Sequence, residues 1–232
     1  MRALRERIVA VPTERMHLWL MLVLTFTTGV NDAVGYLGLG KVFTGNMTGN
    51  VVVLGMALVG GSGLPVLGPA LALLGFMTGA AIAGRTLKRA DRSWHGRTTA
   101  IFGLVAFLML ALGLGLLLVD ERTPSRAEEI TVTTIAALAM GLQAAAARLV
   151  AVKDVTTVVV TSTITGLAAD SYFGSGKGGG TARRAIAVLA IIAGAVAGAA
   201  LLKWHTGAGL LLAGVVIALA TWLGDLHDRA HR

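Results

Sequence analysis

The sequence lacks cysteine, and this absence excludes disulfide bonds, thiolate metal sites and a cysteine nucleophile. Charged residues are also scarce: they make up 14% of the 232 residues, whereas 55% are hydrophobic and the mean hydropathy is +0.77. A chain with so few charges cannot coat the surface of a water-soluble globule. The composition therefore predicts an all-α integral membrane protein in contact with a lipid bilayer.

Further absences narrow the function. The net charge of +8 comes from loops between apolar segments, and no basic stripe carries interleaved aromatic residues, so we expect no nucleic-acid partner. The five histidines fall at segment ends or in loops, which leaves no metal cluster, and no motif calls for a cofactor. The patterns HExxH and GxSxG and a buried nucleophile beside a base are also missing. We therefore expect no enzymatic activity.

Eight apolar segments follow one another along the chain, separated by short polar or glycine-rich connections. They cover residues 17–39, 42–59, 64–84, 98–119, 130–150, 155–173, 185–202 and 207–223. The first apolar run is too long for a signal-peptide core, so we expect it to be kept as a helix. No connection is long enough for a soluble domain, and residues 1–232 are expected to form a single membrane domain.

The positive-inside rule indicates how many of these segments cross the membrane. Eight crossings would divide the Lys and Arg residues almost evenly between the two sides. If segments 42–59 and 155–173 instead enter and leave on one side, the residues left outside are Lys41, Arg122, Arg126 and Lys203. The sequence therefore predicts six transmembrane helices and two re-entrant half-helices. Both termini and loops 85–97 and 174–184 are expected in the cytoplasm, with the chain in the cytoplasmic (inner) membrane of a bacterium.

The two halves of the chain resemble each other at a nearly constant offset. The matched pairs are Gly29 with Gly141, Asn31 with Gln143, Thr44 with Thr157, Thr48 with Thr161 and Asn50 with Thr163. Each half also has a GxxxG spacing, which allows close helix approach within the chain or in a homodimer. The first repeat would cover 17–119 and the second 130–224. Three crossings in each copy would reverse the orientation of the second, giving an inverted-topology repeat.

The stretch GVNDAVGYLGLGKVFTGNMTGNVVVLG, residues 29–55, gathers polar groups at membrane depth. It resembles the signature of the YoaK-like family of bacterial membrane proteins, a G-x-x-D-A stretch followed by F-x-x-N-M-T-G-N. The resemblance covers nearly the whole chain and implies the architecture and the membrane location, but no substrate. The second half departs from the family pattern, with Ala144 and Ser162 where Asn and Gly are expected.

Two half-helix N-termini that face one pocket would offer unpaired backbone N–H groups to a solute. Such a pocket favours a small anion or a carbonyl-rich neutral solute. The residues expected to bind this solute are Asn31, Thr44, Asn46, Thr48, Asn50, Gln143, Thr157, Thr161 and Thr163. Thr and Asn at these positions also suit helix capping, and Gln143 also suits a bridge between helices.

Asp32 is the one acid deep within the first apolar segment. An acid at such depth is usually an ion or proton site, so we expect Asp32 to couple solute movement to protons. A structural ion pair with Lys41 or Arg148 is the alternative. Together these features predict a secondary transporter or channel for a small-molecule solute. A non-transporting scaffold or receptor, associating through its GxxxG faces, is the second hypothesis.

Overall fold

The computed structural model describes residues 10–60, 63–88, 93–118, 124–150, 160–172, 174–176 and 180–231. Within these ranges every element is a helix. The helices are α2 (Thr13–Gly38), α3 (Met47–Val59), α4 (Leu67–Thr86), α5 (Gly96–Leu118), α6 (Arg126–Val150), α7 (Val160–Ala169), α8 (Thr181–Leu202) and α9 (Thr206–His231). Six of them are long and apolar enough to cross a membrane, while α3 and α7 are shorter. The expectation of an all-helical membrane protein is thereby confirmed.

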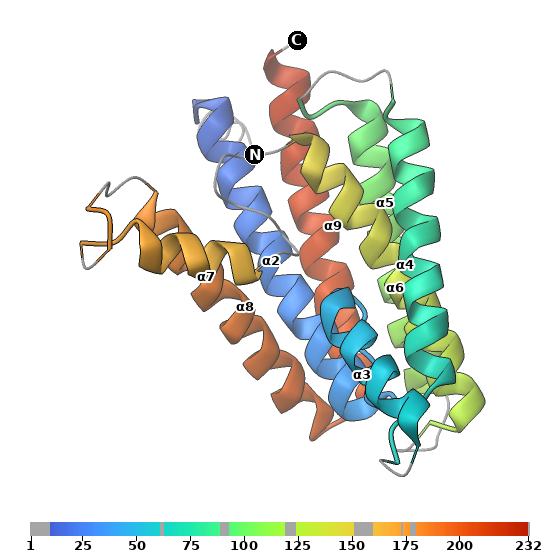
Figure 1. Cartoon of the computed structure of the whole chain (residues 1–232). Helices are drawn as coiled ribbons and strands as arrows, with labels where there is room; N and C mark the ends of the chain where they lie inside the picture. The colour runs from blue at the N-terminus through green and yellow to red at the C-terminus, as the bar shows by residue number, and fades with distance from the viewer. Residues whose placement is uncertain are drawn as a thin grey trace.

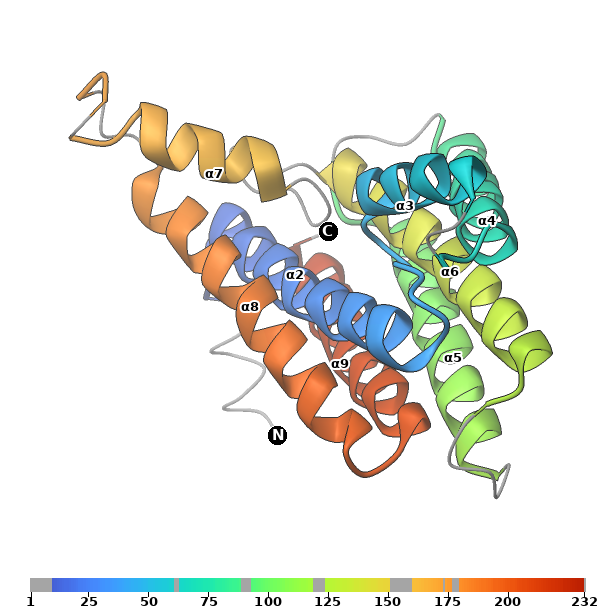
Figure 2. The same ribbon diagram turned by 60° about the horizontal axis from the view of Figure 1, so that its bottom comes forward.

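The six long helices form one bundle in which the direction of the chain alternates (Figure 1). The start of α2 and the end of α9 lie at one end of the bundle, together with the end of α4 and the start of α5. The end of α2 and the starts of α4, α6 and α9 lie at the opposite end. Figure 2 shows α7 at the outside of the bundle, where it packs against α8.

Close helix pairs are made possible by glycines. The main pairs are α2 with α8, α4 with α6, and α5 with α9. A Cβ on Gly29 would collide with the carbonyl oxygen of Ile191, and a Cβ on Gly141 would collide with that of Phe76. Gly79 and Gly194 face the partner backbones in the same way. The GxxxG faces of α4 and α8 are therefore covered within the chain, which leaves them unavailable for a homodimer of the kind the scaffold hypothesis requires.

The side chains of the bundle divide into an interior and an apolar outer surface. Large side chains that are fully buried in α5 and α9 include Phe102, Met109, Leu210 and Ile217. Large apolar side chains that are exposed include Val59, Phe107, Leu118 and Val196. An apolar outer surface suits contact with lipid, where the helices keep their backbone polar groups paired internally.

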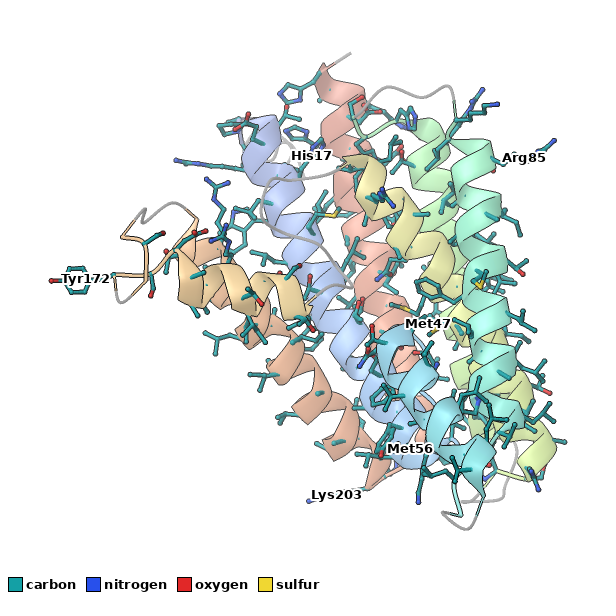
Figure 3. The ribbon with its side chains drawn as sticks, in the orientation of Figure 1. His17, Met47, Met56, Arg85, Tyr172 and Lys203 are labelled. Atoms are coloured by element: carbon teal, nitrogen blue, oxygen red, sulfur yellow. The ribbon has the colours of Figure 1, made fainter. Side chains whose placement is uncertain are left out.

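The segments predicted at 42–59 and 155–173 are helical over only part of their length. Helix α3 begins at Met47 because the preceding residues turn back along α2 instead of continuing a helix. Figure 3 shows Met47 about midway between His17 at one end of the bundle and Lys203 at the other, with Met56 nearer Lys203. The chain therefore returns from the end of α2 to mid-bundle before α3 runs outward again. Helix α7 has 10 residues within the described part of the chain.

Candidate functional site

Asp32 lies on α2 beside the chain that leads into α3. Its Oδ1 accepts hydrogen bonds from the backbone N–H groups of Thr44, Gly45 and Asn46, at 3.0, 2.7 and 3.2 Å. Hydrogen bonds to a carboxylate are stronger than those between neutral groups, so this one oxygen fixes the start of the half-helix. Among the described residues, Asp32 forms no ion pair with Lys41 or Arg148, and the structural alternative that the sequence left open is not the one observed.

The N-terminus of α3 is mostly satisfied from within the chain. The Asn46 side chain caps the helix by accepting a hydrogen bond from Gly49 N at 3.1 Å. The backbone N–H of Met47 donates to Gly45 O at 3.1 Å. The donors that the sequence analysis left free for an anion are thus largely used, either by these contacts or by Asp32. This end of the site is not arranged to receive an anionic solute.

Asn50 fastens the incoming chain to α3. Its Oδ1 accepts from Phe43 N at 2.9 Å, and its Nδ2 donates to Phe43 O at 2.6 Å. The Phe43 ring stacks on Tyr36 with centroids 4.7 Å apart. A Cβ on Gly49 would lie 2.7 Å from that ring, so the position requires glycine. The motif at 43–50 therefore builds the turn into α3, and the Asn50 amide is committed to the backbone.

Two buried amide side chains each form a hydrogen bond between α2 and α6. Asn31 on α2 is fully buried, and its Nδ2 donates to Met140 Sδ of α6 at 3.2 Å. Gln143 on α6 is also fully buried, and its Nε2 donates to Leu24 O of α2 at 3.5 Å. Among the described residues, neither Asn31 Oδ1 nor Gln143 Oε1 has a hydrogen-bond partner. Two buried acceptors are thus left without a donor from the described residues.

The remaining expected site residues lie in different surroundings. Thr44 is fully buried beside Asp32, whereas Thr48 in the first turn of α3 is exposed. Thr161 is exposed and Thr163 is buried, both on α7. Thr157 lies outside the described residues. The structure therefore brings Thr44 and Asn46 to Asp32 and places Thr161 and Thr163 on a helix that packs against α8, whereas Gln143 lies on α6.

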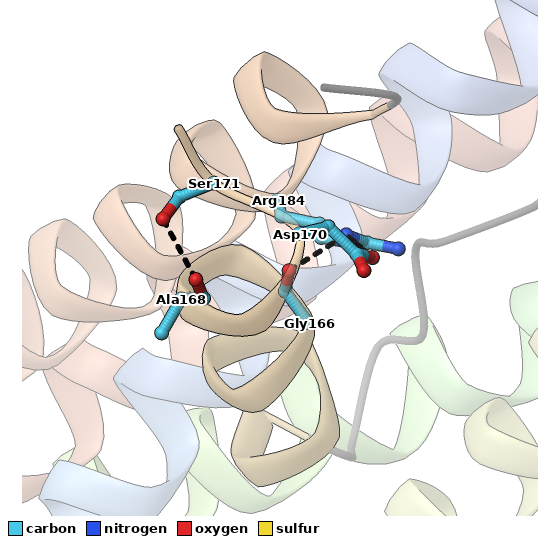
Figure 4. A network of polar contacts seen from close by, with 5 residues as sticks. All are labelled: Gly166, Ala168, Asp170, Ser171 and Arg184. Carbon is cyan, nitrogen blue, oxygen red and sulfur yellow. Dashed lines mark hydrogen bonds and ion pairs between the residues drawn. The ribbon is translucent and has the colours of Figure 1, made fainter. Parts of the chain in front are cut away.

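The end of α7 is held by a side chain of α8. Arg184 Nη1 donates to Gly166 O at 2.8 Å and to Asp170 Oδ2 at 2.7 Å, as Figure 4 shows. The side chains of Arg184 and Asp170 are 12% and 33% exposed, so the ion pair is partly shielded from solvent. A Cβ on Gly166 would press on the guanidinium, which explains the glycine. This pair fixes the outer end of α7.

Sequence reasoning missed Met140 and Arg184. Met140 accepts from Asn31, and its Cε would lie 3.3 Å from a Cβ on Gly45, so it joins α2, α6 and the entry to α3. The signal available was its position three residues before Gln143, on the same helix face. Arg184 was assigned to a loop, and only its place in the first turn of α8 brings it to Asp170. Within the described residues no group of His, Asp and Glu suited to a metal is found.

The chain matches the family described as "Protein of unknown function (DUF1275)" over residues 20–223. It is 32% identical over 152 residues to the UPF0700 transmembrane protein YoaK of Bacillus subtilis (strain 168). This match covers 65% of each chain, slightly less than two thirds of the length of that relative. No solved structure matches the chain. These similarities agree with the membrane architecture and carry no information about a solute.

Proposed function

The chain belongs to the DUF1275 family, and on that premise we propose that it is a small-solute secondary transporter or channel, coupled to protons through Asp32. The observation that carries this proposal is the set of three backbone N–H groups bound by one carboxylate oxygen at the start of α3. A half-helix that begins mid-bundle is the kind of element on which many transporters build their sites. Here its position depends on a group that can gain or lose a proton.

Corresponding contacts in the two halves support an inverted-topology repeat. Exchanging α2 with α6, α3 with α7, α4 with α8 and α5 with α9 turns the α2–α8 pair into the α6–α4 pair. The same exchange turns α2–α9 into α6–α5, and α3–α4 into α7–α8. Gly29 on α2 and Gly141 on α6 meet their partner helices through the same kind of backbone contact. With three spans in each half, the second copy would enter the membrane from the opposite side.

Protonation of Asp32 gives a simple coupling step. The charged carboxylate strengthens the hydrogen bonds from Thr44, Gly45 and Asn46, and a neutral carboxyl is a weaker acceptor. Loading a proton would therefore loosen the chain that leads into α3, and releasing it would fix this chain again. Movement of α3 toward and away from Asp32 would open the site to one side of the membrane at a time.

Unpaired acceptors favour a solute that carries hydrogen-bond donors. Asn31 Oδ1 and Gln143 Oε1 have no donor within the described residues, and a buried acceptor left unpaired costs about 1–3 kcal/mol. A solute with N–H or O–H groups would recover this free energy on binding. The proposal thus shifts from the small anion or carbonyl-rich neutral solute that the sequence favoured to a donor-bearing small solute. The hydroxyl groups of Thr48, Thr161 and Thr163 remain proposed contacts of the alternate states.

The proposed setting is the cytoplasmic membrane of a bacterium with both termini in the cytoplasm. The basic residues described at the end that holds the start of α2 include Arg15, Arg85, Lys88 and Arg97. The ends of α2 and α8 and the start of α6 carry Lys41, Lys203 and Arg126. This distribution supports the orientation expected from the positive-inside rule. Since the chain lacks native cysteine, labelling of a cysteine placed at Ser93 tests it: outside labelling of intact cells would contradict the orientation.

The experiment that tests the function uses the full chain reconstituted in vesicles containing a pH-sensitive dye. Small amides, amino acids, anions and nucleobases are added outside under an imposed pH gradient. We expect solute-dependent proton entry for at least one donor-bearing solute, and no such entry with Asp32→Asn. Absence of flux across all four classes, with protein shown to be folded and inserted, would favour the scaffold or receptor hypothesis.

A further inference from the structure

A cavity of about 500 Å³ opens at the end of the bundle where α2 finishes and α6 begins. Its walls come from the connection between α2 and α3, the connection between α3 and α4, and the first turns of α6. This volume is within the range of pockets that hold small molecules. The cavity is separate from the contacts of Asp32, although Val42 in its wall precedes Thr44 by only two residues.

Three charged side chains line this cavity without pairing. They are Lys41 on the connection after α2, and Arg126 and Glu129 in the first turn of α6. Within the described part of the chain, none of the three side chains forms an ion pair or a side-chain hydrogen bond. The cavity therefore offers two cations and one carboxylate that remain available to an incoming molecule.

The backbone at Gly40 and Lys41 sets this charge arrangement. Both residues have positive φ, at +71° and +60°, and Lys41 adopts this conformation although it carries a Cβ. A Cβ on Gly40 would lie 2.9 Å from Glu129 Oε2, so glycine allows the carboxylate to lie against the connection. The turn thus places Lys41 next to the residue that the Glu129 carboxylate approaches, yet the two side chains form no ion pair.

We infer that this cavity captures a small apolar amino acid in its zwitterionic form. The carboxylate of the amino acid would contact Lys41 and Arg126, and its ammonium group would contact Glu129. The apolar side chain would lie against Leu39, Val42 and Ile130, which also line the cavity. A simple anion would leave Glu129 unpaired, and a simple cation would leave two positive charges facing it.

The cavity shares a face of α6 with Gln143 and with Met140, the hydrogen-bond partner of Asn31. Glu129, Thr133, Met140 and Gln143 follow one another at spacings of four, seven and three residues, which places them along one side of α6. An ammonium group held at Glu129 is also the kind of donor that the carbonyl oxygens of Asn31 and Gln143 lack. The inference therefore deepens the proposed function, on which it rests for the view that the captured molecule is the transported solute.

The test compares three molecules of nearly the same shape on the purified full chain in detergent. L-leucine carries both charges, 4-methylpentanoate lacks the ammonium group, and 3-methylbutylamine lacks the carboxylate. Binding is measured at pH 7 by calorimetry. We expect leucine to bind about tenfold or more tightly than either analogue, because each analogue can form charge-assisted contacts with groups of only one sign in the cavity.

Three variants assign the charges. Glu129→Gln should remove the preference for leucine over 4-methylpentanoate, and Arg126→Gln should reduce the preference over 3-methylbutylamine. Lys203→Gln is the matched control, since Lys203 is an exposed cation at the same end of the bundle but outside the cavity lining. It should bind all three molecules as the native chain does. Unliganded melting temperatures show whether each variant is folded.

The possible results separate the two proposals. Equal binding of leucine and 4-methylpentanoate would show an anion site, equal binding of leucine and 3-methylbutylamine would show a cation site, and absence of leucine binding would exclude the inference altogether. Asp32-dependent flux of another solute without leucine binding would overturn the inference and leave the proposed function standing. Leucine binding that depends on Glu129, without flux of any solute, would overturn the proposed function and leave the binding site standing.

Discussion

The two short helices occupy corresponding places in the chain, and within the described residues the contacts that differ most lie at the start of α3 and at the end of α7. Helix α3 is fixed where it begins, by Asp32 through three backbone hydrogen bonds and by Asn50 through two contacts with Phe43. Helix α7 is fixed where it finishes, by the contacts of Arg184 with Gly166 and Asp170. Similar stretches rich in Thr and Gly thus take part in two different structural arrangements.

One sequence position distinguishes the two halves. The residue in α6 that corresponds to Asp32 at the repeat offset is Ala144, which has no polar group to receive backbone N–H donors. The carboxyl to which we assign proton coupling therefore lies on α2 and has no counterpart at the matching position of α6. Both repeats nevertheless keep the glycine contacts that hold their long helices together. The comparison teaches that the two halves share the glycine contacts between long helices but not the carboxyl at the position of Asp32.

The largest expected effect comes from removing the Asp32 carboxyl. Asp32→Ala would leave the backbone N–H groups of Thr44, Gly45 and Asn46 without their acceptor. We expect a loss of about 3 kcal/mol or more in the free energy of unfolding. Reversible unfolding in mixed detergent micelles measures this loss. Ala144→Asp is the reciprocal variant in the second half. Slower hydrogen exchange of α7 in this variant would weaken the contrast between the two short helices.

The shared scaffold predicts equal effects in the two halves. Gly29→Ala and Gly141→Ala would each place a Cβ against a partner carbonyl oxygen, and each should cost about 1–3 kcal/mol. Gly103→Ala on α5 is the control, since a Cβ there meets no atom within 4 Å. It should be neutral or slightly stabilising. A large difference between the first two variants, measured by the same unfolding assay, would contradict equivalent packing in the two repeats.

A smaller and local effect is expected at the end of α7. Arg184→Gln removes the ion pair with Asp170, which is partly exposed and therefore worth only about 1 kcal/mol. Hydrogen exchange should become faster in residues 160–172 and stay unchanged in α3. The pH dependence of flux should also stay unchanged. If the pH dependence were lost, the second repeat would take part in coupling and the comparison would fail.

The smallest effect on stability is expected at the exposed threonines. Thr48→Val and Thr161→Val remove hydroxyls at the surface of α3 and α7, and each should change the unfolding free energy by less than about 0.5 kcal/mol. The informative measurement is the stabilisation that a bound solute adds. It should fall in both variants if both helices contact the solute. If bound solute stabilised both variants as much as it stabilises the native chain, these threonines would have only a structural role.

The sequence was sufficient to predict the helices, but it did not predict which residues far apart in the chain contact one another. Hydropathy and the distribution of Lys and Arg predict six long helices and two short ones, as the structure shows. These predictions follow from hydropathy and charge, which are local properties of neighbouring residues in the chain. The long apolar helices confirm the membrane class, and the family match over residues 20–223 confirms the family resemblance.

Partners far apart in the chain depend on how the helices are oriented around their axes. Asp32 reaches residues 44–46 only because the chain reverses at Gly40 and Lys41 in positive-φ conformations. Periodicity does not report such a reversal, so sequence reasoning left the N–H groups of α3 free. The pairing of Arg184 with Asp170 depends in the same way on the packing of α7 against α8.

The most direct test of the central claim is the pH dependence of solute flux with Asp32→Asn. Asparagine keeps the shape of the side chain and one oxygen acceptor for Thr44, Gly45 and Asn46, so the fold and solute binding should survive. It cannot bind and release a proton. The account predicts that uptake in vesicles loses its pH dependence and that accumulation against a gradient stops. Accumulation with native pH dependence in this variant would show that Asp32 is structural and that the coupling proposal is wrong.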